Sequence, residues 1–151
     1  MNDWKRILIA VDNTPTSRKA IRYAANIIGR LEEARIHLLH IYPEPPPGYY
    51  SSGRSLDDYV EEKDREGGDI FADAVLTLQE AGITEQTITT ECRMAEHRTI
   101  SQTILAVQEE GRYGTIVVGK RGVSKAEEFL FGSISNALLH HGRDVAIWVV
   151  G

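Results

Sequence analysis

The sequence predicts an α/β protein in which helices flank a parallel β-sheet. Short apolar runs that suit buried strands alternate with segments of helical period along the whole chain. The first run, RILIAVD at residues 6–12, has an apolar interior without a polar face, as expected of a strand that is covered on both sides. A chain of 151 residues with 42% hydrophobic content is long enough for one compact core. We therefore expect one domain that spans residues 1–151.

The next three elements are a helix, a strand and a long loop. Residues 13–31 offer Thr14 and Ser17 as candidate caps for a helix whose apolar residues then recur on one face. The apolar run at residues 35–42 predicts the second strand. Residues 43–53 contain four prolines and two glycines, and this composition predicts an irregular loop.

The rest of the chain continues the alternation. Residues 55–81 have helical period and an acidic first half, while Gly67 and Gly68 favour a break or kink there. The remaining elements are a strand, a helix, a strand, a helix and a last strand, expected at residues 87–94, 98–111, 115–119, 132–142 and 144–150. The expected order is therefore β-α-β-α-β-α-β-α-β, without a linker, a repeat or a low-complexity block.

Composition and charge argue against several classes of protein. The chain has 17 Lys and Arg against 22 Asp and Glu, so we expect no nucleic-acid partner, because such a partner needs many cations. No apolar run approaches the ~20 residues that cross a bilayer, and residues 1–12 lack the pattern of a signal peptide. We expect a cytoplasmic protein without a membrane contact. The single cysteine, Cys92, excludes an intrachain disulfide, and we interpret it as a small core residue or a half-buried one.

Cations, glycines and serines gather between the apolar run that ends at Gly119 and the last expected helix. Parallel sheets bind ligands outside the carboxyl ends of their strands, often where a glycine-rich turn leads into a helix. Gly119 and Gly122 would let backbone amides approach a ligand, and Gly132 with Ser133 would open a helix with its N–H groups. Further cations and a hydroxyl come from Lys120, Arg121, Lys125 and Ser135. These groups predict an anion site of the phosphate type, and a solvated turn is the alternative.

The spacing of these glycines resembles that of the universal stress protein family. Gly119-x2-Gly122-x9-Gly132-Ser133 matches the G-x2-G-x9-G-[S/T] pattern of the family's ATP-binding members. The opening ILIAVDNTPTS, the segments LLHIY and TIVVGKRG and the tail DVAIWVV also resemble strands and turns of this family. The resemblance therefore runs from about residue 5 to residue 150.

Two departures from the family pattern are visible. The letters GRD stand before the last strand, where members often carry a turn of the Pro-Cys-Pro type. Glu127 and Glu128 place negative charge within the x9 segment, where they would weaken phosphate binding if they faced the ligand. We expect both to face solvent or to pair with Lys125 or Arg121.

The resemblance implies a fold, a ligand and a set of site residues. The fold would be a single-domain, Rossmann-like open parallel sheet of five strands in the order 3-2-1-4-5, with helices on both faces. The ligand would be ATP, with Mg²⁺ bridging its phosphates. Adenine and ribose would lie beside the ends of the first two strands, at Ala10, Val11, Asp12, Thr14 and Ile41. The ribose and the first phosphate would lie along Val118, Gly119, Lys120, Arg121 and Gly122. The remaining phosphates would be bound by Gly132, Ser133, Ile134 and Ser135 at the start of the helix. The alternative role of Asp12 is a local Asx turn.

The function implied by the resemblance is that of a nucleotide-binding protein in a stress response or in signalling. A slow ATP hydrolase, or a self-phosphorylating protein with Ser133 or Ser135 as acceptor, is the alternative. A family member that binds no nucleotide is a third. The chain lacks G-x4-G-K-[S/T], an early G-x-G-x-x-G, S-G-G-x-D-S and H-x-G-H, which argues against four nucleotide enzyme classes. We assign no catalytic residue and no protein metal ligand.

Histidines and loop tyrosines are weaker candidates. His37 and His40, three residues apart on an expected strand, would point to opposite faces and not share a metal. The adjacent histidines at 140–141 would diverge by about 100° on a helix. We interpret both pairs as core-edge or surface residues. The tyrosines at 49–50 either close over a base or face solvent.

The last strand predicts an assembly. Residues 145–150 are apolar on both faces, and in the implied sheet order they form an edge without a proline, a glycine or a lysine to protect it. Pairing of this edge with its own copy about a two-fold axis would remove the hazard. We therefore expect a homodimer through Val145–Val150. The alternative is that a helix or loop of the same chain covers the edge.

Overall fold

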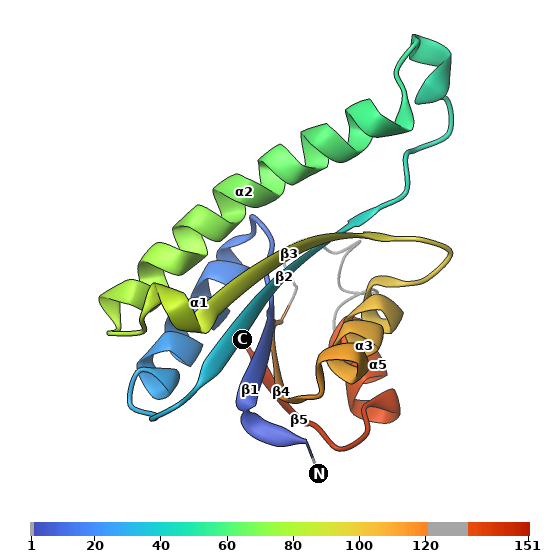
Figure 1. The fold of residues 1–151 in the computed structure, drawn as a ribbon. Helices are drawn as coiled ribbons and strands as arrows, with labels where there is room; N and C mark the ends of the chain where they lie inside the picture. Colours follow the sequence, from blue (N-terminus) through green and yellow to red (C-terminus); the bar gives the residue numbers. More distant parts are fainter. Residues whose placement is uncertain (1, 121–132) are drawn as a thin grey trace.

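The computed structural model describes residues 2–120 and 133–151, and its centre is a five-stranded parallel sheet (Figure 1). The strands lie in the order β3-β2-β1-β4-β5, which confirms the expected topology. They are β1 (Asp3–Ala10), β2 (Arg35–Pro43), β3 (Ile88–Ala95), β4 (Tyr113–Gly119) and β5 (Ala146–Val150). The direction of strand addition reverses between β1 and β4. Ligands of open α/β sheets bind at such a reversal.

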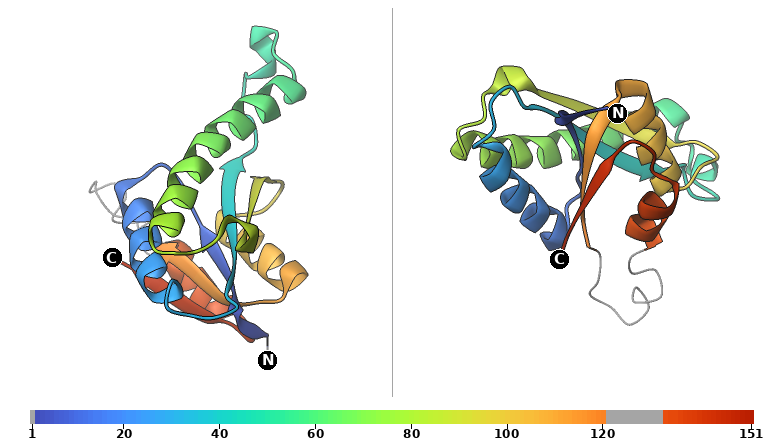
Figure 2. Two further views of the ribbon diagram at one scale, coloured as in Figure 1. Left: turned by 60° about the vertical axis from the view of Figure 1, so that its left-hand side comes forward. Right: turned by 90° about the horizontal axis from the view of Figure 1, so that it is seen from below.

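Helices cover both faces of the sheet. The first face carries α1 (Pro15–Ile28) and α2 (Leu56–Glu80), and the second carries α3 (Ile100–Gly111) and α5 (Ser133–His141) (Figure 2). Two short 3-10 turns are η1 (Tyr50–Ser52) and η2 (Glu85–Thr87). Within the ranges that the structure describes, no helix has the length and apolar character of a membrane span.

The central strand divides the apolar core into two clusters. Ile7 and Ile9 of β1 pack with α1 and α2, whereas Leu8 packs with α3 and α5. All three side chains are buried, because successive residues of a strand point to opposite faces and both faces are covered. This double burial is why the first strand reads as a continuous apolar run.

Side-chain caps fix where three helices begin. The Thr14 hydroxyl accepts a hydrogen bond from the N–H of Ser17 and starts α1 directly after β1. Ser55 and Thr99 start α2 and α3 in capping boxes, each with the side chain three positions further on. These bonds satisfy N–H groups that a helix start leaves without a backbone partner.

The expected break in the acidic helix was wrong. Helix α2 continues through Gly67 and Gly68 from Leu56 to Glu80. Gly67 is buried, and a Cβ added there would lie 2.9 Å from the Sγ of Cys92, whereas one at Gly68 would meet nothing within 4 Å. The first glycine thus permits close packing of α2 on β3 and does not interrupt the helix.

Several element boundaries differ from the expected ones. β1 ends at Ala10, so Val11 and Asp12 belong to the turn that follows. β5 begins at Ala146, because Asp144 has a φ of 52° and cannot continue an extended strand. Residues 44–49 are irregular as expected, but η1 adds a short helical turn where the chain enters the projecting end of α2 (Figure 1).

Candidate functional site

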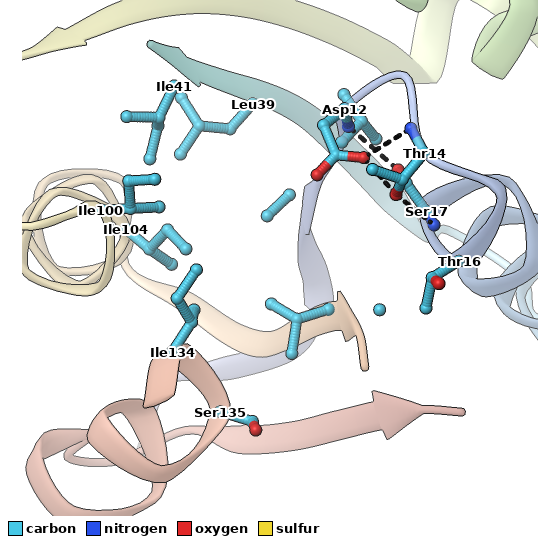
Figure 3. A pocket seen from close by; sticks show the side chains of 14 residues that line it. Asp12, Thr14, Thr16, Ser17, Leu39, Ile41, Ile100, Ile104, Ile134 and Ser135 are labelled. Carbon is cyan, nitrogen blue, oxygen red and sulfur yellow. Dashed lines mark hydrogen bonds between the residues drawn. The ribbon is translucent and has the colours of Figure 1, made fainter. Parts of the chain in front are cut away.

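A cavity opens at the carboxyl ends of β1 and β4, between the starts of α1 and α5 (Figure 3). Its empty volume is about 690 Å³, which includes space open to solvent. Its lining consists of Ala10, Val11, Asp12, Thr14, Thr16, Ser17, Leu39, Ile41, Ile100, Ile104, Val118, Gly119, Ile134 and Ser135.

One wall of the cavity is a hydrogen-bonded turn. The Oδ1 of Asp12 accepts the N–H of Thr14 at 2.8 Å and also the Thr14 hydroxyl (Figure 3). In return, the N–H of Asp12 donates to the Oγ of Ser17 at 2.9 Å. The bond from the Thr14 N–H to the Asp12 carboxylate is that of an Asx turn, so this alternative role of Asp12 is confirmed. The same residue also borders the cavity, so its carboxylate is held in a fixed place beside any ligand.

The opposite wall is apolar. Leu39 and Ile41 come from β2, Ile100 and Ile104 from α3, and Ile134 from α5 (Figure 3). An apolar wall that faces a few fixed polar groups is the usual composition of a small-molecule site. It suits a flat ring that carries a polar appendage.

The end of β4 lies against the start of α1. A Cβ added at Gly119 would lie 2.9 Å from the carbonyl oxygen of Thr16, so this approach needs glycine. Helix α5 begins on the other side, at Ser133, and Ser135 of its first turn borders the cavity (Figure 3). N–H groups and the partial positive charge of a helix start are favourable for an anion.

The structure brings most of the predicted site residues around this one cavity. Those that line it are Ala10, Val11, Asp12, Thr14, Ile41, Val118, Gly119, Ile134 and Ser135. Lys120 and Ser133 are chain neighbours of the lining without belonging to it. Arg121, Gly122 and Gly132 lie outside the described residues, as do Lys125, Glu127 and Glu128.

Sequence reasoning missed part of the lining. Ile100 and Ile104 recur at the spacing of an ordinary core helix, and nothing in that spacing distinguishes a cavity wall from a packed core. Leu39 likewise belongs to a continuous apolar strand. Ser17 was identified as a candidate cap and not as a lining residue. Thr16, which follows the proline at the start of α1, was not identified as a site residue.

Other candidate groups lie away from the cavity. Cys92 is half-buried, and burial, with the negative charge of Asp64 as a second cause, raises the pKa of its thiol to about 11. The tyrosines at 49–50 pack edge to face with each other, and Tyr49 also packs on Tyr59 of α2. Across the residues that the structure describes, no group of three or more His, Cys, Asp or Glu side chains is placed to hold a metal ion.

The two strand histidines have separate partners, as expected. His37 binds Thr89 at 2.7 Å and Glu91 at 3.0 Å, and its ring stacks on Tyr113. The Nδ1 of His40 lies 2.8 Å from the carbonyl oxygen of Val11, just behind the cavity. His40 is therefore close to the site without lining it.

Comparison with known proteins decides the family. The model of the universal stress protein family matches residues 3–148. The chain belongs to the universal stress protein family. A curated relative, universal stress protein YxiE of Bacillus subtilis, is 26% identical over 140 residues, which cover 88% of this chain and 90% of that protein.

Solved structures of universal stress proteins share the fold. The protein from Archaeoglobus fulgidus in complex with dAMP has a TM-score of 0.61 at 17% identity, covering 97% of this chain and 97% of that chain. An Arabidopsis thaliana family protein with AMP bound has a TM-score of 0.62 at 15% identity, covering 96% of this chain and 90% of that one. At these identities the likeness shows the fold of this universal stress protein, and the bound nucleotides are properties of those two proteins.

Proposed function

We propose that this universal stress protein binds ATP in the cavity between β1 and β4 and acts in stress response or signalling through its nucleotide state. The observation that carries the proposal is the cavity itself, in which an apolar slot leads to a fixed carboxylate and to the start of a helix. Related folds with bound dAMP and AMP support an adenine nucleotide as the ligand.

The residues suggest an orientation for the nucleotide. The adenine ring would lie against Ile41 and the isoleucines of α3, where apolar contact is available. Asp12 would accept hydrogen bonds from the ribose hydroxyls. The phosphates would extend past Gly119 toward the first turn of α5, with Lys120 and the residues at 121–122 and 132–133 contributing charge and N–H groups.

A magnesium ion bound to the phosphates of the nucleotide is compatible with this arrangement. Mg²⁺ usually keeps several waters and binds phosphate oxygens with one or two protein groups. Asp12 and the Ser135 hydroxyl border the cavity and are oxygen donors of the kind that Mg²⁺ accepts. When bound, the ion would neutralise phosphate charge.

The second candidate function is self-phosphorylation. It is favoured by one observation, the position of Ser135 on the cavity wall at the expected phosphate end. The γ-phosphoryl group of ATP would pass to the Ser135 Oγ and ADP would be released. The proton of the Ser135 hydroxyl would pass to water. Incubation with ATP followed by phosphopeptide mass spectrometry tests this, and an unmodified Ser135 peptide after prolonged incubation would contradict it.

Calorimetry on matched variants tests nucleotide binding. Ala10 lines the cavity, so Ala10→Leu should fill part of it and weaken ATP and AMP binding at least tenfold. Ala72→Leu, at an exposed position of α2 away from the lining, is the control and should bind as the wild type does. Mass spectrometry of ligand released from fresh protein should find an adenine nucleotide. A wild-type protein that binds neither nucleotide would refute the proposal.

We also propose that the protein forms a homodimer through β5. This strand is one edge of the sheet, and Val149 is 39% exposed on it. A shallow apolar groove formed by Tyr23, Ile27 and the last residues of β5 adjoins the edge. Antiparallel pairing with a second copy would cover both the edge and the groove.

A further inference from the structure

The pairing of β1 with β2 stops short of the end of β2. The last paired residues are Ala10 and Leu39, and one more backbone bond follows, from the N–H of Val11 to the carbonyl of Leu39 at 2.8 Å. β2 nevertheless continues to Pro43 in register with β3. In a parallel ladder, the next bond would run from the N–H of Ile41 to the carbonyl of Val11. Within residues 2–120, that bond is not formed.

The side chain of His40 takes this bond instead. Its Nδ1 lies 2.8 Å from the carbonyl oxygen of Val11. A carbonyl oxygen only accepts, so the proton of this bond must sit on Nδ1. The other end of the same peptide unit, the N–H of Asp12, donates to the Oγ of Ser17 at 2.9 Å. Side chains from β2 and α1 therefore hold the Val11–Asp12 peptide unit at both ends.

We propose that His40 is a positioning residue for the nucleotide, an inference that rests on the proposed function. By supplying the donor for Val11, it leaves the Ile41 backbone on the β1 side available for hydrogen bonds to a ligand in the cavity. It also fixes the peptide plane from which the Asp12 side chain leaves the backbone. His40 is not itself part of the cavity lining and acts from behind the cavity through Val11.

The position of the His40 ring explains why a histidine fits there. His40 points toward the face of the sheet that α2 covers, and a Cβ added at Gly67 would lie 3.7 Å from its Cδ2. The ring therefore lies beneath Gly67 of α2, at a distance where an added Cβ would make an ordinary contact with it. From this position the Nδ1 of the imidazole reaches the carbonyl oxygen of Val11 in the turn after β1.

Three substitutions separate the bond from the bulk of the ring. His40→Asn places an amide N–H near the position of Nδ1, His40→Gln places it near that of Nε2, and His40→Leu removes the donor. We expect His40→Asn to bind AMP within about twofold of the wild type. His40→Gln and His40→Leu leave a carbonyl without its donor and should bind about tenfold more weakly.

The selective readout is hydrogen exchange of the Asp12 amide, measured by NMR without ligand. A general loss of stability would accelerate exchange at the amides of other elements as well. The Asp12 amide should be protected in the wild type and in His40→Asn. In His40→Gln and His40→Leu it should exchange about tenfold faster, when its rate is compared with the rates of amides in β4. A His40→Gln variant with wild-type protection and affinity would overturn the proposal. So would faster exchange without weaker AMP binding, or a His40→Asn variant as weak as His40→Leu.

Failure of this inference differs from failure of the proposed function. A wild-type protein that binds neither AMP nor ATP would refute the nucleotide site and with it the role of His40 toward a ligand. The exchange pattern of the unliganded variants still decides whether His40 holds the turn. If one variant does not fold, the comparison of His40→Asn with the remaining variant retains the contrast between a donor near Nδ1 and none.

Discussion

At the scale of single residues, the turn after β1 shows how few atoms fix the candidate site. Asp12, Thr14 and Ser17 bind one another in a closed set of hydrogen bonds, and Thr14 is also the N-cap of α1. Each bond is modest alone, because folding exchanges it for a bond to water. Together they leave the Asp12 carboxylate little freedom, which lowers the cost of ordering it around a ligand.

Loss of the Thr14 hydroxyl should therefore cost more than a surface substitution. Thr14→Ala removes the cap of α1 and one partner of Asp12, and we expect the free energy of unfolding to fall by about 1–2 kcal/mol. Thr14→Ser keeps the hydroxyl and should stay within about 0.5 kcal/mol of the wild type. Urea unfolding measures both. Equal losses in the two variants would show that the methyl group, and not the cap, is responsible.

The thiol of Cys92 should be unreactive. Burial raises its pKa to about 11, so at pH 8 much less of it is thiolate, the reactive form, than in an ordinary cysteine. We expect iodoacetamide to modify the folded protein at least tenfold more slowly than the unfolded protein at pH 8. The rate should rise as pH increases toward 11. Mass spectrometry follows the reaction, and equal rates for folded and unfolded protein would contradict this.

At the scale of elements, the two glycines of α2 form a natural pair for comparison. Alanine is the better helix former by about 1 kcal/mol at both positions. At Gly68 nothing opposes it, so Gly68→Ala should stabilise the protein by about 0.5–1 kcal/mol. At Gly67 the new Cβ would meet the Cys92 Sγ at 2.9 Å, and Gly67→Ala should destabilise by about 1–3 kcal/mol.

A double-mutant cycle identifies the cause of the Gly67 effect. If the clash with sulfur is responsible, Gly67→Ala combined with Cys92→Ala should be more stable than the sum of the two single changes predicts. Thermal and urea unfolding of the four proteins give the coupling. An additive result would place the cost elsewhere in the contact between α2 and β3.

The elements also show what the sequence alone could and could not predict. The strands were predictable because burial on both faces leaves a continuous apolar run, as at Ile7, Leu8 and Ile9. The uninterrupted path of α2 was not, because the reason for Gly67 lies in β3, a strand that is remote in sequence. The place of Asp12 beside the cavity was predictable, because this residue follows the first strand at the carboxyl edge of the sheet, where open α/β folds bind ligands. The apolar half of the site was not, since Ile104 follows the same spacing as any core residue.

At the scale of the whole molecule, the open edge of β5 is the basis of the proposed homodimer. The Val150 carbonyl accepts the Lys120 N–H, so Val150 directs its backbone groups toward β4. In a parallel strand these directions alternate from residue to residue, and Ile147 and Val149 therefore point theirs outward. A proline at Ile147 should remove an outward donor while the ladder to β4 remains.

We expect Ile147→Pro to convert a dimer into a folded monomer. Light scattering at micromolar concentration measures the mass, and circular dichroism checks that the fold survives. Trp148→Pro, which would remove a donor directed toward β4, is the comparison and should destabilise the fold itself. A monomeric wild-type protein, or an Ile147→Pro protein that remains a dimer, would refute the β5 interface.

The neighbours β1 and β4 are distant in the chain, with Ile7 beside Thr115 in the sheet. A cavity that opens between them cannot form before Val118 and Ile134 have been synthesised, and both follow the lining residues of β1, β2 and α3 in the chain. Any ligand of this cavity would recognise only chains in which β1 and β4 have paired. Its binding would slow turnover of complete molecules by proteases and leave truncated chains unprotected.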